Sequence, residues 1–134
     1  MHNPPLVLIA DDNSDFREIL STKLKQSGFW VAEAKDGAEA VLKAQSLQPD
    51  LIVMDIQMPN ENGTEAVLDL KRNPVTKDTK IVFFTSLENP WPGIKAKNEK
   101  FAEELGAAQF INKADDLDQM AKKIQEIIGA PDKK

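Results

Sequence analysis

The sequence contains no cysteine, which excludes a disulfide framework and any metal site built on thiolates. It also has no apolar run near the roughly 18 residues that a membrane-spanning helix needs. Residues 1–5 lack the basic and apolar regions of a signal peptide. From these absences we expect a cytoplasmic protein that does not enter a membrane.

Basic side chains are too few for a nucleic-acid surface. The chain has 17 Lys and Arg against 22 Asp and Glu, which gives a net charge of −5. Nucleic-acid binding depends on basic side chains that neutralise phosphates, so direct contact with DNA or RNA is not expected.

Length and composition indicate one folded domain. The 134 residues can bury a single core but are too few for two ordinary domains, and 41% of them are hydrophobic and 29% charged. We expect a single domain over residues 1–134, with a core from about 6 to 128. The ends, 1–5 and 129–134, are expected to be flexible.

Short apolar runs alternate with segments of helical periodicity, which predicts buried parallel strands between amphipathic helices. The predicted strands cover residues 6–10, 29–34, 51–55, 80–85 and 108–112. The predicted helices run from Asn13 or Ser14 to about 27, and over 38–47, 65–72, 94–105 and 117–128. Their apolar stripes include Ile19 and Leu42. Five such repeats predict an α/β protein with a (βα)5 doubly wound fold.

Polar residues lie at the carboxyl ends of four of the predicted strands: Asp11 and Asp12, Asp55, Thr85 and Ser86, and Lys113. The carboxyl ends of parallel strands share one edge of a sheet, so these residues are expected to form one site. Carboxylates near 4 Å apart repel by about 4 kcal/mol per pair at an effective dielectric of about 20, which favours a bound cation. Oxygen ligands without histidine or cysteine favour a hard ion, Mg²⁺.

A phosphoryl donor would give these residues separate roles. An aspartate can attack phosphorus and form an acyl phosphate. The cation, a lysine and the hydroxyl of Thr85 would stabilise charge on the phosphoryl oxygens. The pattern therefore predicts self-phosphorylation.

The whole set of motifs resembles the receiver domain of two-component response regulators, of the stand-alone type found among chemotaxis regulators. The matching residues are Asp11-Asp12, Asp55 with Met58-Pro59 and Gly63, Thr85-Ser86, and Lys113. The resemblance covers about residues 6–128. It implies a flavodoxin-like, five-stranded parallel sheet in the order 2-1-3-4-5.

The resemblance also implies chemistry for the carboxylates. Asp55 would accept a phosphoryl group from a histidine kinase or a phosphotransfer protein. Mg²⁺ would be bound by Asp11 and Asp12, chiefly Asp12, by Asp55 and by the backbone carbonyl of Gln57. Such a protein catalyses only its own phosphorylation and dephosphorylation, so it is not expected to be an enzyme acting on other substrates.

The remaining implied roles concern signalling. Thr85 and Lys113 would contact the phosphoryl group, and Phe110 would turn inward when Thr85 moves. An effector protein would bind the face formed by the segment after Thr85, the helix at 94–105, the strand at 108–112 and the last helix. The resemblance also implies that the protein is a monomer or a weak dimer.

Two features depart from the family pattern. Lys113 is followed by Ala114 where the family usually has proline, so a trans peptide bond is expected there, with a shifted loop. Thr85 and Lys113 are 28 positions apart, a longer separation than in compact members of the family, and we expect the extra residues to lie within 87–97.

Two other functions remain open from the sequence. A receiver-like scaffold could bind partners without phosphorylation, as the two departures allow. A phosphohydrolase of the haloacid dehalogenase type would also use an aspartyl nucleophile, but it places a second aspartate two residues later, where this chain has Gln57.

Overall fold

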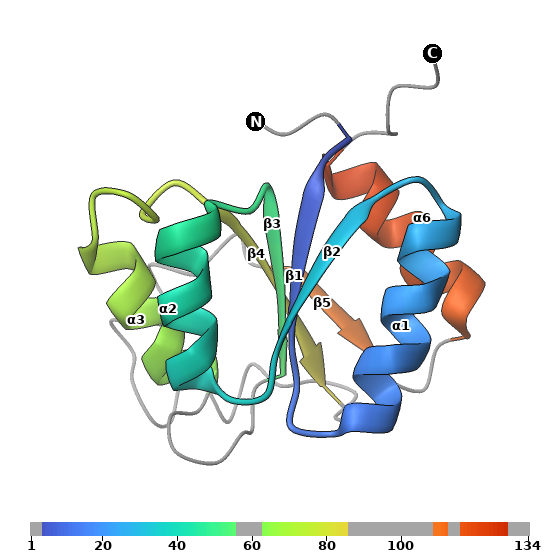
Figure 1. Ribbon diagram of the computed structural model, residues 1–134, viewed down its shortest axis with the longest axis horizontal. Helices are drawn as coiled ribbons and strands as arrows, with labels where there is room; N and C mark the ends of the chain where they lie inside the picture. Colours follow the sequence, from blue (N-terminus) through green and yellow to red (C-terminus); the bar gives the residue numbers. More distant parts are fainter. Residues whose placement is uncertain (1–3, 56–62, 86–108, 113–115, 129–134) are drawn as a thin grey trace.

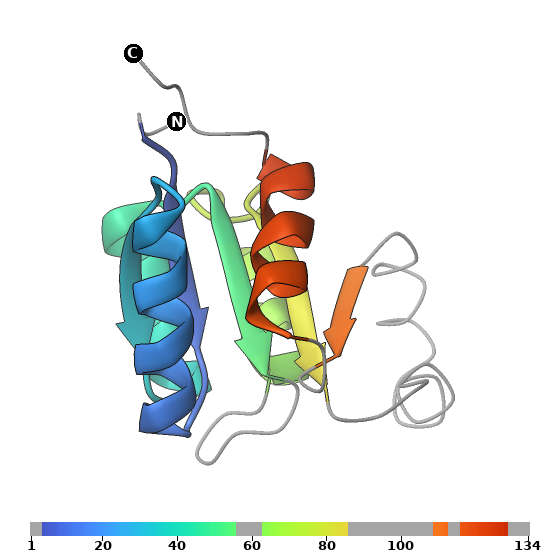
Figure 2. The ribbon, with the colours of Figure 1, turned by 90° about the vertical axis from the view of Figure 1, so that its right-hand side faces the viewer.

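A five-stranded parallel sheet forms the centre of the fold, and its strand arrows all point the same way (Figure 2). The computed structural model describes residues 4–55, 63–85, 109–112 and 116–128. The strands are β1 (Leu6–Ala10), β2 (Trp30–Ala34), β3 (Leu51–Asp55), β4 (Lys80–Thr85) and β5 (Gln109–Asn112). Their order is β2-β1-β3-β4-β5, which confirms the predicted order 2-1-3-4-5.

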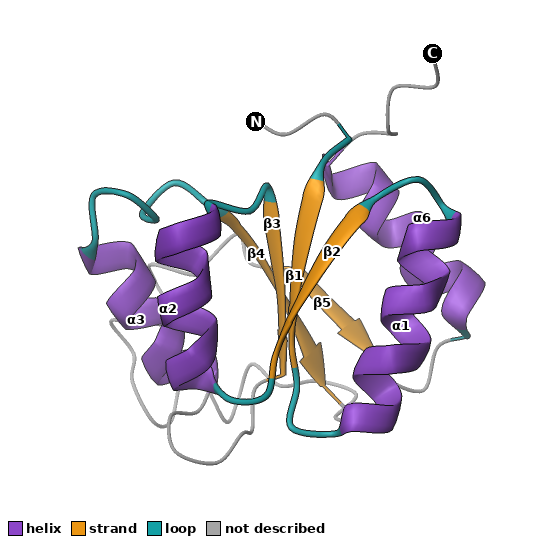
Figure 3. Ribbon diagram, in the orientation of Figure 1, coloured by secondary structure: helices purple, strands orange, loops and turns teal. Residues whose placement is uncertain are grey.

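Helices cover both faces of the sheet (Figures 1 and 3). The described helices are α1 (Ser14–Gln26), α2 (Gly37–Leu47), α3 (Gly63–Arg72) and α6 (Leu117–Ile128). Helices α1 and α6 lie on one face, and α2 and α3 lie on the other. The doubly wound α/β fold is therefore confirmed, while the helix predicted at 94–105 falls outside the described residues.

Strands β1 and β3 are buried on both faces because neighbouring residues point into two different cores. In β1, Leu8 and Ala10 pack toward α2 and α3, whereas Val7 and Ile9 pack toward α1 and α6. All five residues of each strand are buried. This double burial explains why both segments are unbroken apolar runs in the sequence.

The strand register brings the ends of β1 and β3 to the same level. Ala10 pairs with Met54, so Asp11 follows β1 at the level where Asp55 ends β3. Asp55 in turn pairs with Phe84, and Thr85 pairs with Asn112 at the end of β5. One edge of the sheet therefore collects the last residues of four strands.

Helix α2 begins at this edge with a reciprocal cap. The side chain of Asp36 accepts a hydrogen bond from the Glu39 backbone N–H at 2.8 Å, and the Glu39 carboxylate accepts one from the Lys35 N–H at 3.1 Å. The first bond satisfies a donor that the first turn of a helix leaves without an intrahelical partner, and the second holds the backbone just before the cap. Asp36 is buried, whereas the bond between Lys35 and Glu39 is exposed to solvent.

An Asp36→Ala variant should lose about 1 kcal/mol of unfolding free energy, within a range of about 0.5 to 2, because it removes this N-cap. Urea denaturation followed by circular dichroism measures the loss. Asp36→Asn keeps a capping oxygen and should recover most of the stability. A loss of the same size in both variants would contradict the capping role.

Two residues placed on apolar helix stripes by sequence periodicity are exposed instead. Ile19 of α1 is 51% exposed and Leu42 of α2 is 67% exposed. In α2 the buried positions are Gly37, Ala40 and Ala44, at spacings of three and four. Leu42 lies about 200° around the helix from both alanines, so it faces away from the sheet.

Candidate functional site

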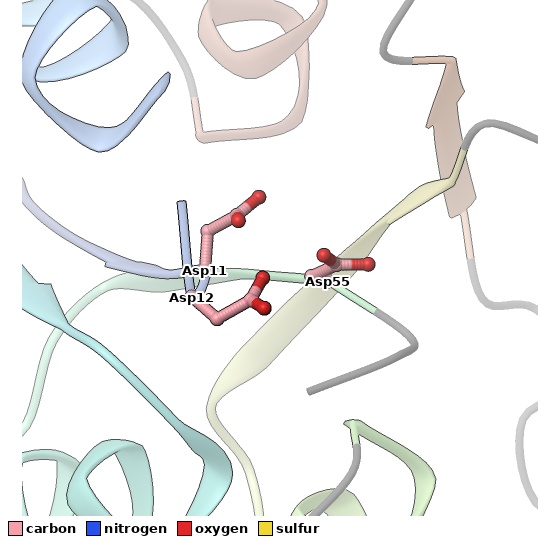
Figure 4. A group of neighbouring side chains, drawn as sticks. All are labelled: Asp11, Asp12 and Asp55. Carbon is pink, nitrogen blue, oxygen red and sulfur yellow. The ribbon is translucent and has the colours of Figure 1, made fainter. Parts of the chain in front are cut away.

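Three carboxylates gather where β1 and β3 end (Figure 4). One oxygen from each of Asp11, Asp12 and Asp55 lies within 4.8 Å of the others. Asp11 is fully buried, Asp55 is 9% exposed and Asp12 is exposed. The group is thus anchored in the protein on one side and accessible to solvent through Asp12.

The loop from β1 to α1 fixes Asp11 in place. The backbone N–H of Asp11 extends the pairing with β2 by donating to the Ala34 carbonyl at 3.1 Å. Its side-chain Oδ1 accepts a hydrogen bond from the Asn13 N–H at 2.9 Å, which forms a tight turn. Asn13 then caps α1 by accepting from the Phe16 N–H at 3.1 Å, so the predicted helix start at Asn13 or Ser14 is confirmed.

The cluster has the electrostatics of a site for a hard cation. At the 4.8 Å limit, two ionised carboxylates such as Asp11 and Asp55 repel by about 3 kcal/mol at an effective dielectric of about 20. A divalent cation would convert this repulsion into attraction. All three side chains offer oxygen ligands, and the exposure of Asp12 leaves the cluster open to the water or phosphate oxygens that would complete the ligand set of Mg²⁺. The residues present therefore fit Mg²⁺.

The other predicted site residues are only partly placed. Thr85 ends β4 and Phe110 lies in β5, so their backbones are at or near the same sheet edge as Asp55. Gln57, Lys113 and Ala114 fall outside the described residues, as does the surplus predicted within 87–97.

Comparison with known proteins identifies the family. Residues 7–125 match the family described as the response regulator receiver domain. The chain belongs to this family. Its receiver fold is also that of solved structures: the chemotaxis response regulator CheY4 of Vibrio cholerae has 29% sequence identity and a TM-score of 0.78, over 92% of this chain and 98% of that chain. The response regulator domain of Thermotoga maritima CheB has 34% identity and a TM-score of 0.73, over 92% of each chain.

Curated relatives are longer than this receiver domain. The DNA-binding dual master transcriptional regulator RpaA of Synechocystis is 29% identical over 129 residues, which make up 96% of this chain and 51% of RpaA. The chain spans about half the length, or less, of the curated relatives that it matches.

The family match favours a phosphoacceptor role over the scaffold and phosphohydrolase alternatives. None of the helices among the described residues has the length and apolarity of a membrane span.

The structure adds one residue to the site of this receiver domain that sequence reasoning missed. Arg17, in the second turn of α1, donates from Nη1 to the backbone carbonyl of Asp11 at 2.6 Å. Its Nε lies 3.3 Å from a carboxylate oxygen of Glu33 in β2. The only sequence signal was a basic residue one turn into the helix after the paired aspartates, which is too common to indicate a site.

Proposed function

We propose that this receiver domain accepts a phosphoryl group on Asp55 from a phosphohistidine of a histidine kinase or phosphotransfer protein. The observation that supports this most directly is the set of three carboxylates within 4.8 Å at the ends of β1 and β3. The match of residues 7–125 to the response regulator receiver domain also supports this role.

Asp11, Asp12 and Asp55, together with the carbonyl of Gln57, would hold Mg²⁺. When bound, the ion would neutralise charge on the phosphoryl oxygens. Asp55 is the nucleophile: its carboxylate oxygen forms a bond to phosphorus as the bond from phosphorus to the imidazole nitrogen breaks. The departing imidazole nitrogen keeps the electron pair of that bond, and a proton on the other ring nitrogen lets the ring leave as neutral imidazole.

Thr85 and Lys113 are proposed to bind the phosphoryl group once it is on Asp55. The end of β4 supports the first assignment, because the Phe84 backbone pairs with Asp55 and Thr85 is the next residue. Lys113 follows directly after Asn112, which pairs with Thr85. A hydroxyl and an ammonium group at these positions would stabilise two different phosphoryl oxygens.

The proposed output is a change in partner binding. Movement of Thr85 would be coupled to Phe110 in β5, and the effector would bind the face that includes β5, α6 and the segment between β4 and β5. We propose that this occurs in the cytoplasm, in a monomer or weak dimer, with residues 1–134 acting as one domain. The acidic charge of −5 supports a protein partner over nucleic acid.

Incubation with acetyl phosphate and Mg²⁺ should add the mass of one phosphoryl group, detected by intact mass spectrometry. Chelation of Mg²⁺ should abolish the gain, and hydroxylamine, which cleaves acyl phosphates, should reverse it. Peptide mapping should place the group on Asp55. No mass gain, or a gain on another residue, would contradict the proposal.

A further inference from the structure

Asp11 is held at three atoms by three different parts of the chain. Its N–H bonds to β2 through Ala34, and its Oδ1 accepts from the N–H of Asn13 in the loop. Its carbonyl oxygen accepts from the Arg17 guanidinium in α1 at 2.6 Å, and the positive charge of the donor strengthens this hydrogen bond. Arg17 is the one of these three partners that reaches Asp11 through a side chain.

Polar groups surround the mostly buried side chain of Arg17. Its side chain is only 16% exposed, and its Nε lies 3.3 Å from the Glu33 carboxylate, which is 40% exposed. The backbone N–H of Arg17 donates to the carbonyl of the cap residue Asn13 at 3.1 Å. The carbonyl of Glu33 accepts from the Lys43 ammonium of α2. The guanidinium therefore joins the end of β1 to α1 and β2 in a single polar contact network.

We propose that Arg17 is a positioning residue for the cation of this receiver domain. Arg17 holds the backbone of Asp11 so that the Asp11 carboxylate keeps its place opposite Asp12 and Asp55. Glu33 balances the positive charge of Arg17. The inference rests on the proposed function, because it takes the carboxylate cluster as the Mg²⁺ site. Partners of metal ligands that fix ligand orientation in this way contribute substantially to metal affinity in other proteins.

The positioning role and a simple charge effect predict opposite results. Arg17 is a cation close to a site that binds a cation, so loss of its charge alone should strengthen Mg²⁺ binding. Loss of its hydrogen bond to Asp11 should weaken binding, because the ligand is no longer held in one geometry. The direction of the change therefore distinguishes the two roles.

Isothermal titration of the unphosphorylated chain with Mg²⁺ measures this direction. We expect Arg17→Gln to raise the Mg²⁺ dissociation constant about tenfold. The double variant Arg17→Gln/Glu33→Gln keeps the net charge of the wild type and should also bind more weakly. Arg72→Gln is the matched control: it removes the same charge from an exposed position at the last residue of α3, at the opposite end of the helix from the site edge.

A fold check accompanies the titration. Circular dichroism should show native helix content for each variant, and Mg²⁺ should raise the thermal midpoint less in Arg17→Gln than in Arg72→Gln. If Arg17→Gln does not fold, Arg17→Lys decides, because lysine keeps the charge but lacks the forked geometry that serves both partners. In that case we expect Arg17→Lys to bind Mg²⁺ more weakly than the wild type.

Equal or tighter Mg²⁺ binding in Arg17→Gln, or in Arg17→Lys where that variant decides, would overturn the positioning role. This result is separable from failure of the proposed function. A wild-type chain that binds Mg²⁺ but gains no phosphoryl mass would contradict phosphoryl transfer, while weaker binding in Arg17→Gln would still support the role of Arg17. A wild-type chain that binds no Mg²⁺ would overturn both.

Discussion

An Asp55→Asn variant should gain no phosphoryl mass from acetyl phosphate under conditions that label the wild type completely. The amide of asparagine has no anionic oxygen to attack phosphorus, so no acyl phosphate can form at this position. The substitution is nearly isosteric and lies at the end of β3, so the strand and its pairing with β1 and β4 should be kept. Intact mass spectrometry before and after incubation with Mg²⁺ gives the result.

A matched control separates chemistry from folding in this experiment. Asp50→Asn makes the same change in the carboxylate of the residue just before β3, whose Oδ2 accepts from the Leu6 N–H at 2.8 Å. This variant should be phosphorylated like the wild type. Phosphorylation of Asp55→Asn to the wild-type extent would show that another residue is the acceptor.

The Asp55→Asn variant should also be stabilised less by Mg²⁺ than the wild type. A ligand present at about 100 times its dissociation constant stabilises a protein by about 2.7 kcal/mol when it binds only the folded state. Asp55→Asn keeps Asp11 and Asp12 but loses one charged ligand, so the rise in thermal midpoint on adding Mg²⁺ should be smaller. An equal rise in both proteins would indicate that Asp55 is not a metal ligand.

The sheet could be predicted from sequence because its central strands are buried on both faces. In β1 and β3 every residue must be apolar up to the edge, so the first charged residue marks the end of the strand. Parallel pairing then brings Asp11 and Asp55 together without any further information. The carboxylate cluster is thus a direct consequence of two apolar runs and the topology.

Helix faces and long side chains were less predictable for physical reasons. An apolar residue such as Leu42 fits a helical stripe when only spacing is considered, but its exposure depends on how the helix is rotated against the sheet. The contact of Arg17 with Asp11 depends on a side chain that reaches back across a loop, six positions along the chain. Neither feature has a local signature in a single sequence.

Truncation of Phe84 to alanine should lower the unfolding free energy more than the Asp36→Ala substitution does. Its side chain is fully buried, and its ring meets Phe16 of α1 edge to face, with centroids 5.3 Å apart and planes at 84°. A buried Phe→Ala change typically costs about 3 to 5 kcal/mol. That is a large share of the roughly 5 to 15 kcal/mol by which a domain is stable. Urea denaturation monitored by circular dichroism measures the loss.

Two further variants show whether this loss comes from packing beneath the site. Phe84→Leu keeps most of the volume and should cost much less, about 1.5 kcal/mol or below. Leu42→Ala removes an apolar side chain that is 67% exposed and should change stability by no more than about 0.5 kcal/mol. Because Phe84 pairs with Asp55 on one side and Ile111 on the other, its ring supports the strands that end at the carboxylates. A Phe84→Ala protein as stable as Leu42→Ala would mean that the contact between α1 and β4 does not hold this edge of the sheet together.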